Sequence, residues 1–170
     1  LNKIIFRLLE LVMQKKLRDM IGSGKFITAP GVFDMISTLI ANKMNFPALY
    51  VTGYGISSSY MGLPDAGLMT FTDMETQIRK IVAASDKPVI ADADTGYGGL
   101  LNVRHTVRAY EMLGVAAIQI EDQEYPKKCG HTPGRRVIPT SEMVSKIKVA
   151  LDTRKSDDFL VIARTDSRTS

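Results

Sequence analysis

Short apolar runs alternate with stretches of helical periodicity along this 170-residue chain. The apolar runs that we predict as β-strands are Phe26 to Ala29, Ala48 to Thr52, Pro88 to Ala93, Ala116 to Glu121 and Phe159 to Ala163. A half-exposed strand alternates apolar and polar residues, and most of these runs do not. Continuous apolar runs of this kind are typical of strands that are buried on both faces. The pattern therefore predicts a parallel sheet covered by helices.

Capping residues predict where several helices begin and end. Thr72 with Glu75 three residues later is a capping-box pattern, Asn102 precedes an apolar stripe, and Thr140 follows Pro139. Gly114 is the glycine expected just past the end of the helix that starts at Asn102. These signals place a helix between successive predicted strands.

The first 22 residues carry apolar side chains at helical spacing, which predicts an N-terminal amphipathic helix over residues 1–22. Charged residues such as Arg7 and Glu10 interrupt the run. A secretory signal or a membrane span needs a longer uncharged stretch. We therefore expect neither here, and no membrane partner.

Charge and cysteine content narrow the expected partners and compartment. The chain has 22 basic and 18 acidic residues, a formal net charge of +4, without a block of like charges. This small excess gives no reason to expect nucleic acid as a partner. The single cysteine, Cys129, cannot form an internal disulfide, so a reducing compartment such as the cytoplasm is expected.

Five strand-helix units fit two α/β architectures, a doubly wound open sheet or part of a (β/α)8 TIM barrel. The segment Ala29 to Asp34 after the first predicted strand holds one glycine, where a dinucleotide-binding fingerprint needs three. The barrel is therefore favoured. Because a complete barrel needs about 250 residues, we expect residues 1–170 to form a single domain with its first five units, incomplete at the C-terminus.

Acidic residues follow the third and fourth predicted strands, where parallel strands present their ligand-binding ends. Strand alternation would put Asp92 and Asp94 on one face, with Glu121 nearby. Close carboxylates repel one another, and Mg2+ prefers oxygen ligands of this kind. The sequence thus predicts a magnesium site. The alternative is that these acids cap helices or pair with Arg164 and Lys127.

A long segment without hydrophobic periodicity, Glu124 to Arg136, joins the fourth strand to the next helix. Loops of this length usually carry function or are disordered. Its cations, with Cys129 and His131, predict a mobile lid over an anionic ligand and a thiol suited to proton transfer. A solvated basic loop is the alternative interpretation.

Five motifs in order resemble the isocitrate lyase/phosphoenolpyruvate mutase superfamily. They are Leu63-Pro64-Asp65, Asp92 to Gly98, Ile120 to Gln123, Lys127 to His131 and Ala163 to Asp166. The resemblance runs from Phe26 to the end of the chain. It implies a (β/α)8 barrel that depends on Mg2+, with Mn2+ as an alternative, and acts on α-hydroxy or α-keto acids. It also implies a homodimer or homotetramer that exchanges a helix between subunits.

The resemblance assigns roles residue by residue. Asp92 resembles the direct magnesium ligand, and the acids that resemble water-mediated ligands are Asp65, Asp94 and Glu121. The positions that resemble substrate-binding residues are Thr52, Gly53, Tyr54, Gly130 and Arg164. The positions that resemble catalytic residues are Cys129, Lys127 and His131.

The sequence Lys127 to His131 resembles the carbon-carbon lyase branch, in which the loop cysteine protonates the carbanion left when the C2-C3 bond breaks. Members that cleave 2-methylisocitrate usually have Ser-Gly-Gly where this chain has Thr52-Gly53-Tyr54. The tyrosine resembles the subgroup that cleaves 2,3-dimethylmalate or oxaloacetate. A 2-alkylmalate giving pyruvate and a short carboxylate is the substrate that we favour. The alternatives are 2-methylisocitrate lyase, oxaloacetate hydrolase and phosphonomutase activity.

A non-enzymatic role is the other open class. Five of eight strands would leave two open sheet edges. An incomplete barrel could therefore act as a metal-binding or interaction protein without turnover.

Overall fold

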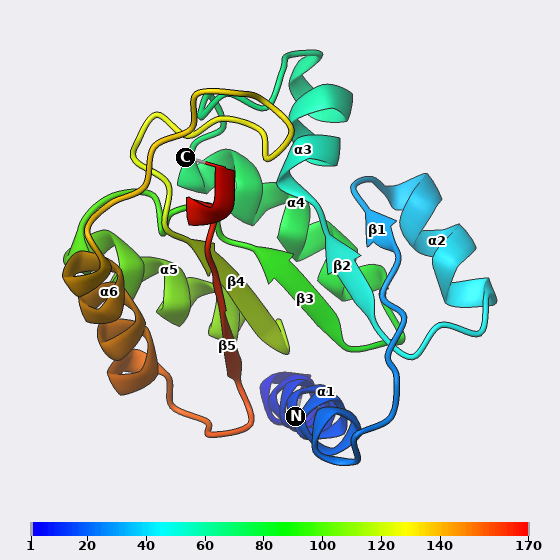
Figure 1. The fold of residues 1–170 in the computed structure, drawn as a ribbon. Coiled ribbons are helices and arrows are strands. Elements are labelled where there is room, and N and C mark those ends of the chain that lie inside the picture. The colour runs from blue at the N-terminus through cyan, green and yellow to red at the C-terminus, as the bar shows by residue number, and fades with distance from the viewer. Residues whose placement is uncertain (1, 170) are drawn as a thin grey trace.

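The computed structural model describes residues 2–169, with side chains described from residue 12 to residue 168. One parallel sheet contains β1 (Gly31–Val32), β2 (Leu49–Val51), β3 (Val89–Asp92), β4 (Ala117–Glu121) and β5 (Leu160–Arg164). The strands lie in sequence order (Figure 1). A doubly wound sheet reverses its order at a switch point, whereas consecutive barrel units do not. The predicted barrel topology is confirmed for these five units.

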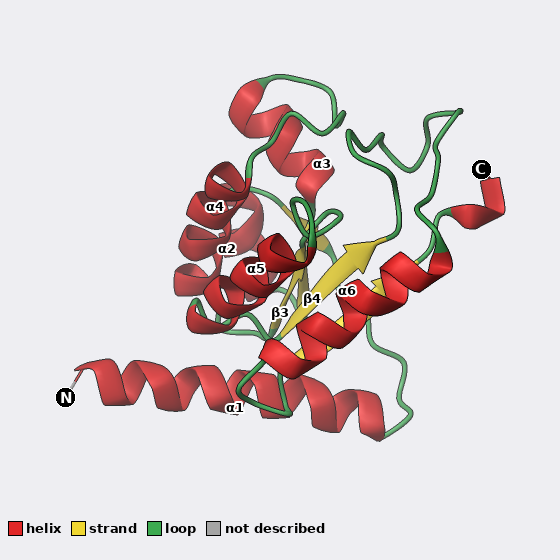
Figure 2. Ribbon diagram, turned by 90° about the vertical axis from the view of Figure 1, so that its left-hand side faces the viewer, coloured by secondary structure: helices red, strands yellow, loops and turns green. Residues whose placement is uncertain are grey.

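Helices cover one face of the sheet (Figure 2). The helices that follow strands β1 to β4 are α2 (Met35–Lys43), α4 (Phe71–Ala84), α5 (Leu100–Met112) and α6 (Thr140–Thr153). Shorter elements are α3 (Gly53–Ile56), a π-helical turn η1 (Ser57–Met61) and a 3-10 turn η2 (Ser167–Thr169). Apolar strand residues such as Val51, Ala91 and Ile120 pack against buried residues such as Ile78 and Val107. The strand residues between them point to the opposite face of the sheet, where Ile90 and Ile162 pack in a second apolar cluster.

Helix α1 (Asn2–Gly22) lies across the N-terminal ends of the strands, below the sheet in Figures 1 and 2. Leu17 is fully buried there, in a cluster with Ala48, Ala116 and Ala117. The predicted helix and its end at Gly22 are confirmed, while Leu1 and the apolar side chains before Val12 lie outside the described part. None of the described helices has the length and apolarity that a bilayer span requires.

The prediction for the first strand was wrong. Backbone pairing begins at Pro30, whose carbonyl accepts a hydrogen bond from the amide of Tyr50, and β1 follows at Gly31. In the predicted run, Ile27 and Ala29 instead pack against the cluster beneath the sheet, and Phe26 is 93% exposed. Ile27 and Ala29 are therefore apolar because they pack near α1, and not because they pair in the sheet.

Two helix starts also differ from the prediction. The N-cap of α4 is Thr70, whose hydroxyl accepts from the amide of Asp73 while the Asp73 carboxylate accepts from the amide of Thr70. The predicted Thr72 lies inside the helix, because two overlapping capping patterns occur in this segment. Helix α5 begins at Leu100, and Asn102 lies in its first turn, accepting from the amide of Gly99.

The predicted start of α6 and the predicted end of α5 are confirmed. Helix α6 begins at Thr140. Gly114 follows the end of α5 with a φ of 86°, a left-handed conformation that glycine adopts without steric cost.

Strand alternation carries polar side chains to the inner face of the sheet. Because Leu49 and Val51 pack in the outer core, Tyr50 between them points to the other side. By the same alternation Gln119 and Glu121 of β4 also point inward. The register aligns Asp92 with Gln119 and Glu121 with Arg164. Acidic, basic and amide groups therefore meet near the C-terminal ends of β3, β4 and β5.

Candidate active site

A cavity of about 490 Å³ opens where the strand ends meet the loop that follows β4. Its lining residues are Tyr50, Thr52, Tyr54, Asp65, Asp92, Glu121, Lys127, Lys128, Cys129, Gly130, His131 and Arg164. Every predicted site residue except Gly53 and Asp94 is in this set, and those two contact lining residues directly. The structure therefore brings the predicted residues together.

Asp92, the last residue of β3, is held by backbone donors. Its Oδ2 accepts a hydrogen bond from the amide of Gly53 at 3.1 Å, and its Oδ1 accepts from the amide of Asp94 at 3.0 Å. A Cβ on Gly53 would lie 2.9 Å from Oδ2, so the close approach needs glycine. The carboxylate is 8% exposed and faces the cavity.

Asp94 does not continue the strand. Its φ is 47°, in the left-handed region, and Tyr97 has a φ of 58°. A turn therefore sets the position of the Asp94 carboxylate, and the expectation of strand alternation beyond Asp92 was wrong. The Tyr97 hydroxyl lies 3.1 Å from the hydroxyl of Tyr110 on α5, which anchors the turn to the outer core.

Lys127 bridges two of the acids. Its Nζ lies 2.6 Å from Oδ1 of Asp65 and 2.6 Å from Oδ1 of Asp94, and the lysine is 5% exposed. Burial lowers the pKa of this ammonium, but the charges of Asp94 and Asp92 outweigh burial and hold the pKa above its usual value. Burial raises the pKa of Asp94, and the negative charge of Asp92 raises it further. The positive charge of Lys127 offsets only part of this shift.

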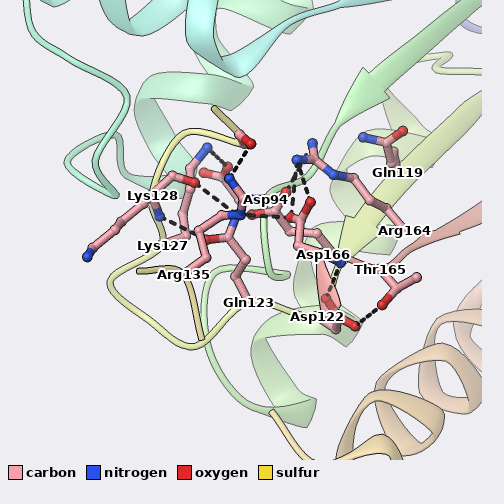
Figure 3. Close-up of polar contacts among 12 residues, drawn as sticks. Asp94, Gln119, Asp122, Gln123, Lys127, Lys128, Arg135, Arg164, Thr165 and Asp166 are labelled. Atoms are coloured by element: carbon pink, nitrogen blue, oxygen red, sulfur yellow. Dashed lines mark hydrogen bonds and ion pairs between the residues drawn. The ribbon is translucent and has the colours of Figure 1, made fainter. Parts of the chain in front are cut away.

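Glu121 and Arg164 form a second ion pair across the ends of β4 and β5, with 3.2 Å between Oε2 and the guanidinium. Burial raises the pKa of Glu121 to about 7, although the charge of Arg164 opposes the shift. Arg164 also pairs with Asp166 at 3.1 Å. Figure 3 shows the side chains of Arg164 and Asp166.

The loop from Glu124 to Arg136 is docked at the cavity. The amide of Cys129 donates to the carbonyl of Asp65 at 2.9 Å, and the half-buried thiol lines the cavity. Arg135, which is 9% exposed, donates to the carbonyls of Gly130 and Thr132. His131 is exposed at the rim. Because Lys127 and Arg135 are buried, the alternative interpretation of a solvated basic loop does not hold for these two residues.

The acid cluster fits a hard divalent cation in its donor chemistry and its charge. Four carboxylates, those of Asp65, Asp92, Asp94 and Glu121, face the two cationic side chains of Lys127 and Arg164. Carboxylate oxygens are the donors that Mg2+ prefers, and an excess of negative charge favours its binding. The donor set therefore suits Mg2+.

The described side chains do not form a ready-made metal centre. Among them, no group of three or more Asp, Glu, His or Cys residues is arranged to hold a metal ion. Lys127 and Arg164 instead pair with three of the acids, which was the alternative interpretation of these residues. Oδ1 of Asp65 and Oδ1 of Asp94 are each bound to the ammonium of Lys127.

Sequence reasoning missed two polar residues at the site. Tyr50 lines the cavity, and its hydroxyl accepts from the side-chain amide of Gln119 at 2.9 Å. Burial, followed by the charge of Asp92, raises the pKa of Tyr50, so its hydroxyl stays protonated. The side-chain amide of Gln123, which follows β4, donates to the carbonyl of Lys128 in the loop and to the carboxylate of Asp166 after β5. A polar residue within an apolar strand was the available signal for Tyr50.

Comparisons with known proteins agree with this site. The family described as phosphoenolpyruvate phosphomutase matches residues 17–170. The chain is 50% identical over 155 residues to a 2,3-dimethylmalate lyase of Eubacterium barkeri, covering 91% of this chain and 54% of the relative. It is 45% identical over 152 residues to a 2-methylisocitrate lyase of Aeropyrum pernix, covering 89% and 48%.

Solved structures extend the similarity to the barrel. An oxaloacetate acetylhydrolase in complex with 3,3-difluorooxalacetate matches with a TM-score of 0.88 at 38% identity, covering 92% of this chain and 55% of that chain. A phosphonopyruvate hydrolase in complex with oxalate and Mg2+ matches with a TM-score of 0.83 at 31% identity, covering 91% and 53%. The chain spans about half the length of the relatives it matches.

Fold, site and comparisons together define the class. The chain belongs to the phosphoenolpyruvate phosphomutase family of the isocitrate lyase/phosphoenolpyruvate mutase superfamily, whose matched structures are TIM-barrel enzymes. Its relatives include both lyases and hydrolases, so membership of the superfamily does not by itself identify the reaction.

Proposed function

We propose that this chain carries the active site of a magnesium-dependent carbon-carbon lyase. The proposed reaction cleaves the C2-C3 bond of a 2-hydroxy diacid, a 2-alkylmalate such as 2,3-dimethylmalate, to give pyruvate and a short carboxylate. The observation that carries the proposal is that a cysteine on a basic loop and the acids at the strand ends share one cavity. The 50% identity to a 2,3-dimethylmalate lyase supports the substrate class.

Cys129 is the proposed proton donor. Cleavage turns the C2 hydroxyl into a carbonyl, releases its proton and leaves a carbanion at C3. The thiol gives its proton to C3, and the proton released from the hydroxyl restores the thiol over the cycle, so no net proton is consumed. The hydrogen bond from the Cys129 amide to the Asp65 carbonyl holds the thiol against the cavity, which supports this role.

Basic residues of the cavity suit the two carboxylates of the substrate. Arg164 offers the planar donor geometry that matches a carboxylate. Lys127 and His131 flank Cys129 on the loop, where Lys127 supplies positive charge and His131 a ring N-H group near the carboxylate of the departing fragment. Thr52 and Tyr54 line the cavity on either side of Gly53, and we propose that this segment contacts the carboxylate and the C2 oxygen of the substrate.

Mg2+, held by Asp92 with Asp65, Asp94 and Glu121 around it, would supply Lewis-acid stabilisation of the negative charge on the C2 oxygen. The Mg2+ in the matched phosphonopyruvate hydrolase complex supports this choice of ion. The chain's own part is to position the acids, and Gly53 does so for Asp92 by approaching Oδ2 without a side chain.

Tyr54 supports a 2-alkylmalate over a tricarboxylate. Its side chain lines the cavity and is 56% exposed, so it takes up room at the open side that a third carboxylate would need. A 2-methylisocitrate lyase is the second candidate, because the relative with that name is 45% identical. An oxaloacetate hydrolase is the third, because of the match to oxaloacetate acetylhydrolase.

The same proposal includes a reducing compartment such as the cytoplasm, since Cys129 must stay a free thiol. It also includes a homodimer or homotetramer, the assembly that the resemblance to the superfamily implies.

The direct test measures pyruvate release by the full-length protein from 2,3-dimethylmalate and from 2-methylisocitrate, and oxalate release from oxaloacetate, each with Mg2+ and with a chelator. The proposal expects turnover of the 2-alkylmalate that Mg2+ restores after chelation. Faster turnover of 2-methylisocitrate or oxaloacetate would assign the second or third candidate. No turnover of the three acids would leave a non-catalytic role as the better reading.

Two substitutions test the residue roles. Cys129→Ser should lose turnover by at least about 100-fold, the scale of a lost proton donor, and still be stabilised against thermal unfolding by oxalate with Mg2+. Asp92→Ala should lose both activity and the stabilisation by Mg2+. Asp152→Ala, at an exposed position of α6, is the matched control. Full activity in Cys129→Ser, or unchanged Mg2+ dependence in Asp92→Ala, would contradict the assignments.

A further inference from the structure

We infer that Gln123 is a positioning residue that seats the catalytic loop by binding the backbone of Lys128 at two points. The inference rests on the proposed function, because it concerns the loop that presents Cys129. Gln123 lies two residues after the end of β4 and is 2% exposed. Figure 3 shows its side chain between the loop and the ends of β4 and β5.

The contact with Lys128 resembles a strand pairing made by a side chain. Oε1 of Gln123 accepts from the amide of Lys128 at 3.0 Å, and Nε2 donates to the carbonyl of the same residue at 2.9 Å. A primary amide has the donor and acceptor needed for both bonds. The two bonds hold the peptide units on either side of the Lys128 Cα, so they fix both the position and the orientation of this residue.

The residues on either side of Lys128 are the ones that the proposed reaction uses. Lys127 reaches Asp65 and Asp94, and Cys129 lines the cavity. The side chain of Lys128 itself is outside this arrangement, since its Nζ donates to the carbonyl of Gly134. Gln123 therefore acts on the backbone between two functional side chains.

Gln123 is itself held from three sides. Nε2 also lies 2.8 Å from Oε1 of Glu121 and 3.0 Å from Oδ2 of Asp166. Its backbone pairs with Val137, where the loop returns toward α6. Two N-H groups are shared among three acceptors, so the bond from the Lys128 amide to Oε1 is the one without a competitor. The side chain thus connects the loop to both strand ends.

The test measures loop seating without relying on lyase activity. Cys129 is alkylated with iodoacetamide in the full-length protein, and modification of that residue is followed by mass spectrometry. Gln123→Met keeps the length of the side chain but removes both bonds to Lys128. Losing two neutral hydrogen bonds should increase the alkylation rate about 30-fold, and amide exchange at Lys128 should rise in parallel.

Gln123→Glu is the second variant, because it still accepts from the Lys128 amide but cannot donate to the carbonyl. Its carboxylate would also face Glu121 and Asp166, so alkylation should again be faster. Gln77→Met on α4 is the matched control, because Nε2 of Gln77 is a buried donor without a partner among the described residues. This control should alkylate at the wild-type rate.

The outcomes separate this inference from the proposed function. Faster Cys129 alkylation in both Gln123 variants, with melting temperatures near that of the wild type, supports the inference. This result does not depend on which substrate the protein cleaves. Wild-type alkylation and exchange in either folded variant would overturn it, even if lyase activity is found. If Gln123→Met does not fold, Gln123→Glu decides the question. If neither variant folds, Gln123 is a structural residue and the inference is wrong.

Discussion

Replacing Lys127 gives the most direct test of the electrostatics at the site. Its Nζ is 2.6 Å from a carboxylate oxygen of Asp65 and from one of Asp94, and these acidic side chains are 10% and 9% exposed. Lys127→Met leaves both carboxylates buried without their shared cation. Breaking a buried ion pair by removing one partner costs about 3–5 kcal/mol. We expect a loss of that size in the free energy of unfolding at pH 8 with a chelator present.

The pH dependence of this loss has a defined sign. The pKa of Asp94 is already raised by burial and by Asp92, and removing Lys127 raises it further. A raised pKa means that the folded state binds the proton more tightly than the unfolded state, so lowering the pH stabilises the folded variant. The deficit relative to the wild type should therefore be largest above pH 7 and should shrink toward pH 5.

Urea unfolding followed by circular dichroism at several pH values measures both effects. Lys128→Met is the matched control, because the ammonium of Lys128 contacts a carbonyl at the exposed surface, and its loss should stay below about 1 kcal/mol. Mg2+ should restore more stability to Lys127→Met than it adds to the wild type. Equal losses in the two lysine variants, or a deficit that grows as the pH falls, would refute this reasoning.

Two further substitutions test the framework of the site. Gly53→Ala brings a methyl group to 2.9 Å from Oδ2 of Asp92, so Mg2+ affinity measured by calorimetry should fall about 10-fold; unchanged affinity would show that Asp92 does not depend on this contact. Tyr97→Phe leaves the hydroxyl of Tyr110 buried without its partner and should cost about 1–3 kcal/mol in urea unfolding, whereas the exposed Tyr60→Phe should cost nothing measurable.

The location of the site could be predicted because parallel strands gather their C-terminal ends at one edge. Asp92, Glu121 and Arg164 each end a strand, so one general rule about the fold brings them together. Neither side-chain distances nor a metal were needed for that step. Local signals sufficed in the same way for the ends of α1 and α5.

The sequence offered Lys127 and Arg164 as possible partners of the acids but could not decide between these ion pairs and a metal site. The pairing of Lys127 with Asp65 and Asp94 depends on how the loop folds back over the strand ends, and no periodicity constrains that segment. Both interpretations of the acids, a metal site and ion pairs, therefore fitted the sequence. Gln123 was missed for the same reason, since its bonds to Lys128 exist only in the folded loop.

Two local predictions failed because a pattern had more than one physical cause. Apolar residues at Phe26 to Ala29 predicted a strand, yet Ile27 and Ala29 are apolar because they pack beneath the sheet. Alternation predicted Asp94 on the face of Asp92, yet alternation holds only while the backbone remains extended. The left-handed φ at Asp94 breaks it.

The arrangement of each strand beside its predecessor has a consequence for biosynthesis. Every new strand can dock on the one that has just left the ribosome, without waiting for a distant segment. At about 5–20 residues added per second, Arg164 emerges roughly 2 to 9 s after Glu121. During that interval the nascent chain holds Glu121 without its guanidinium partner, so the electrostatic balance of the site is completed only by the fifth strand.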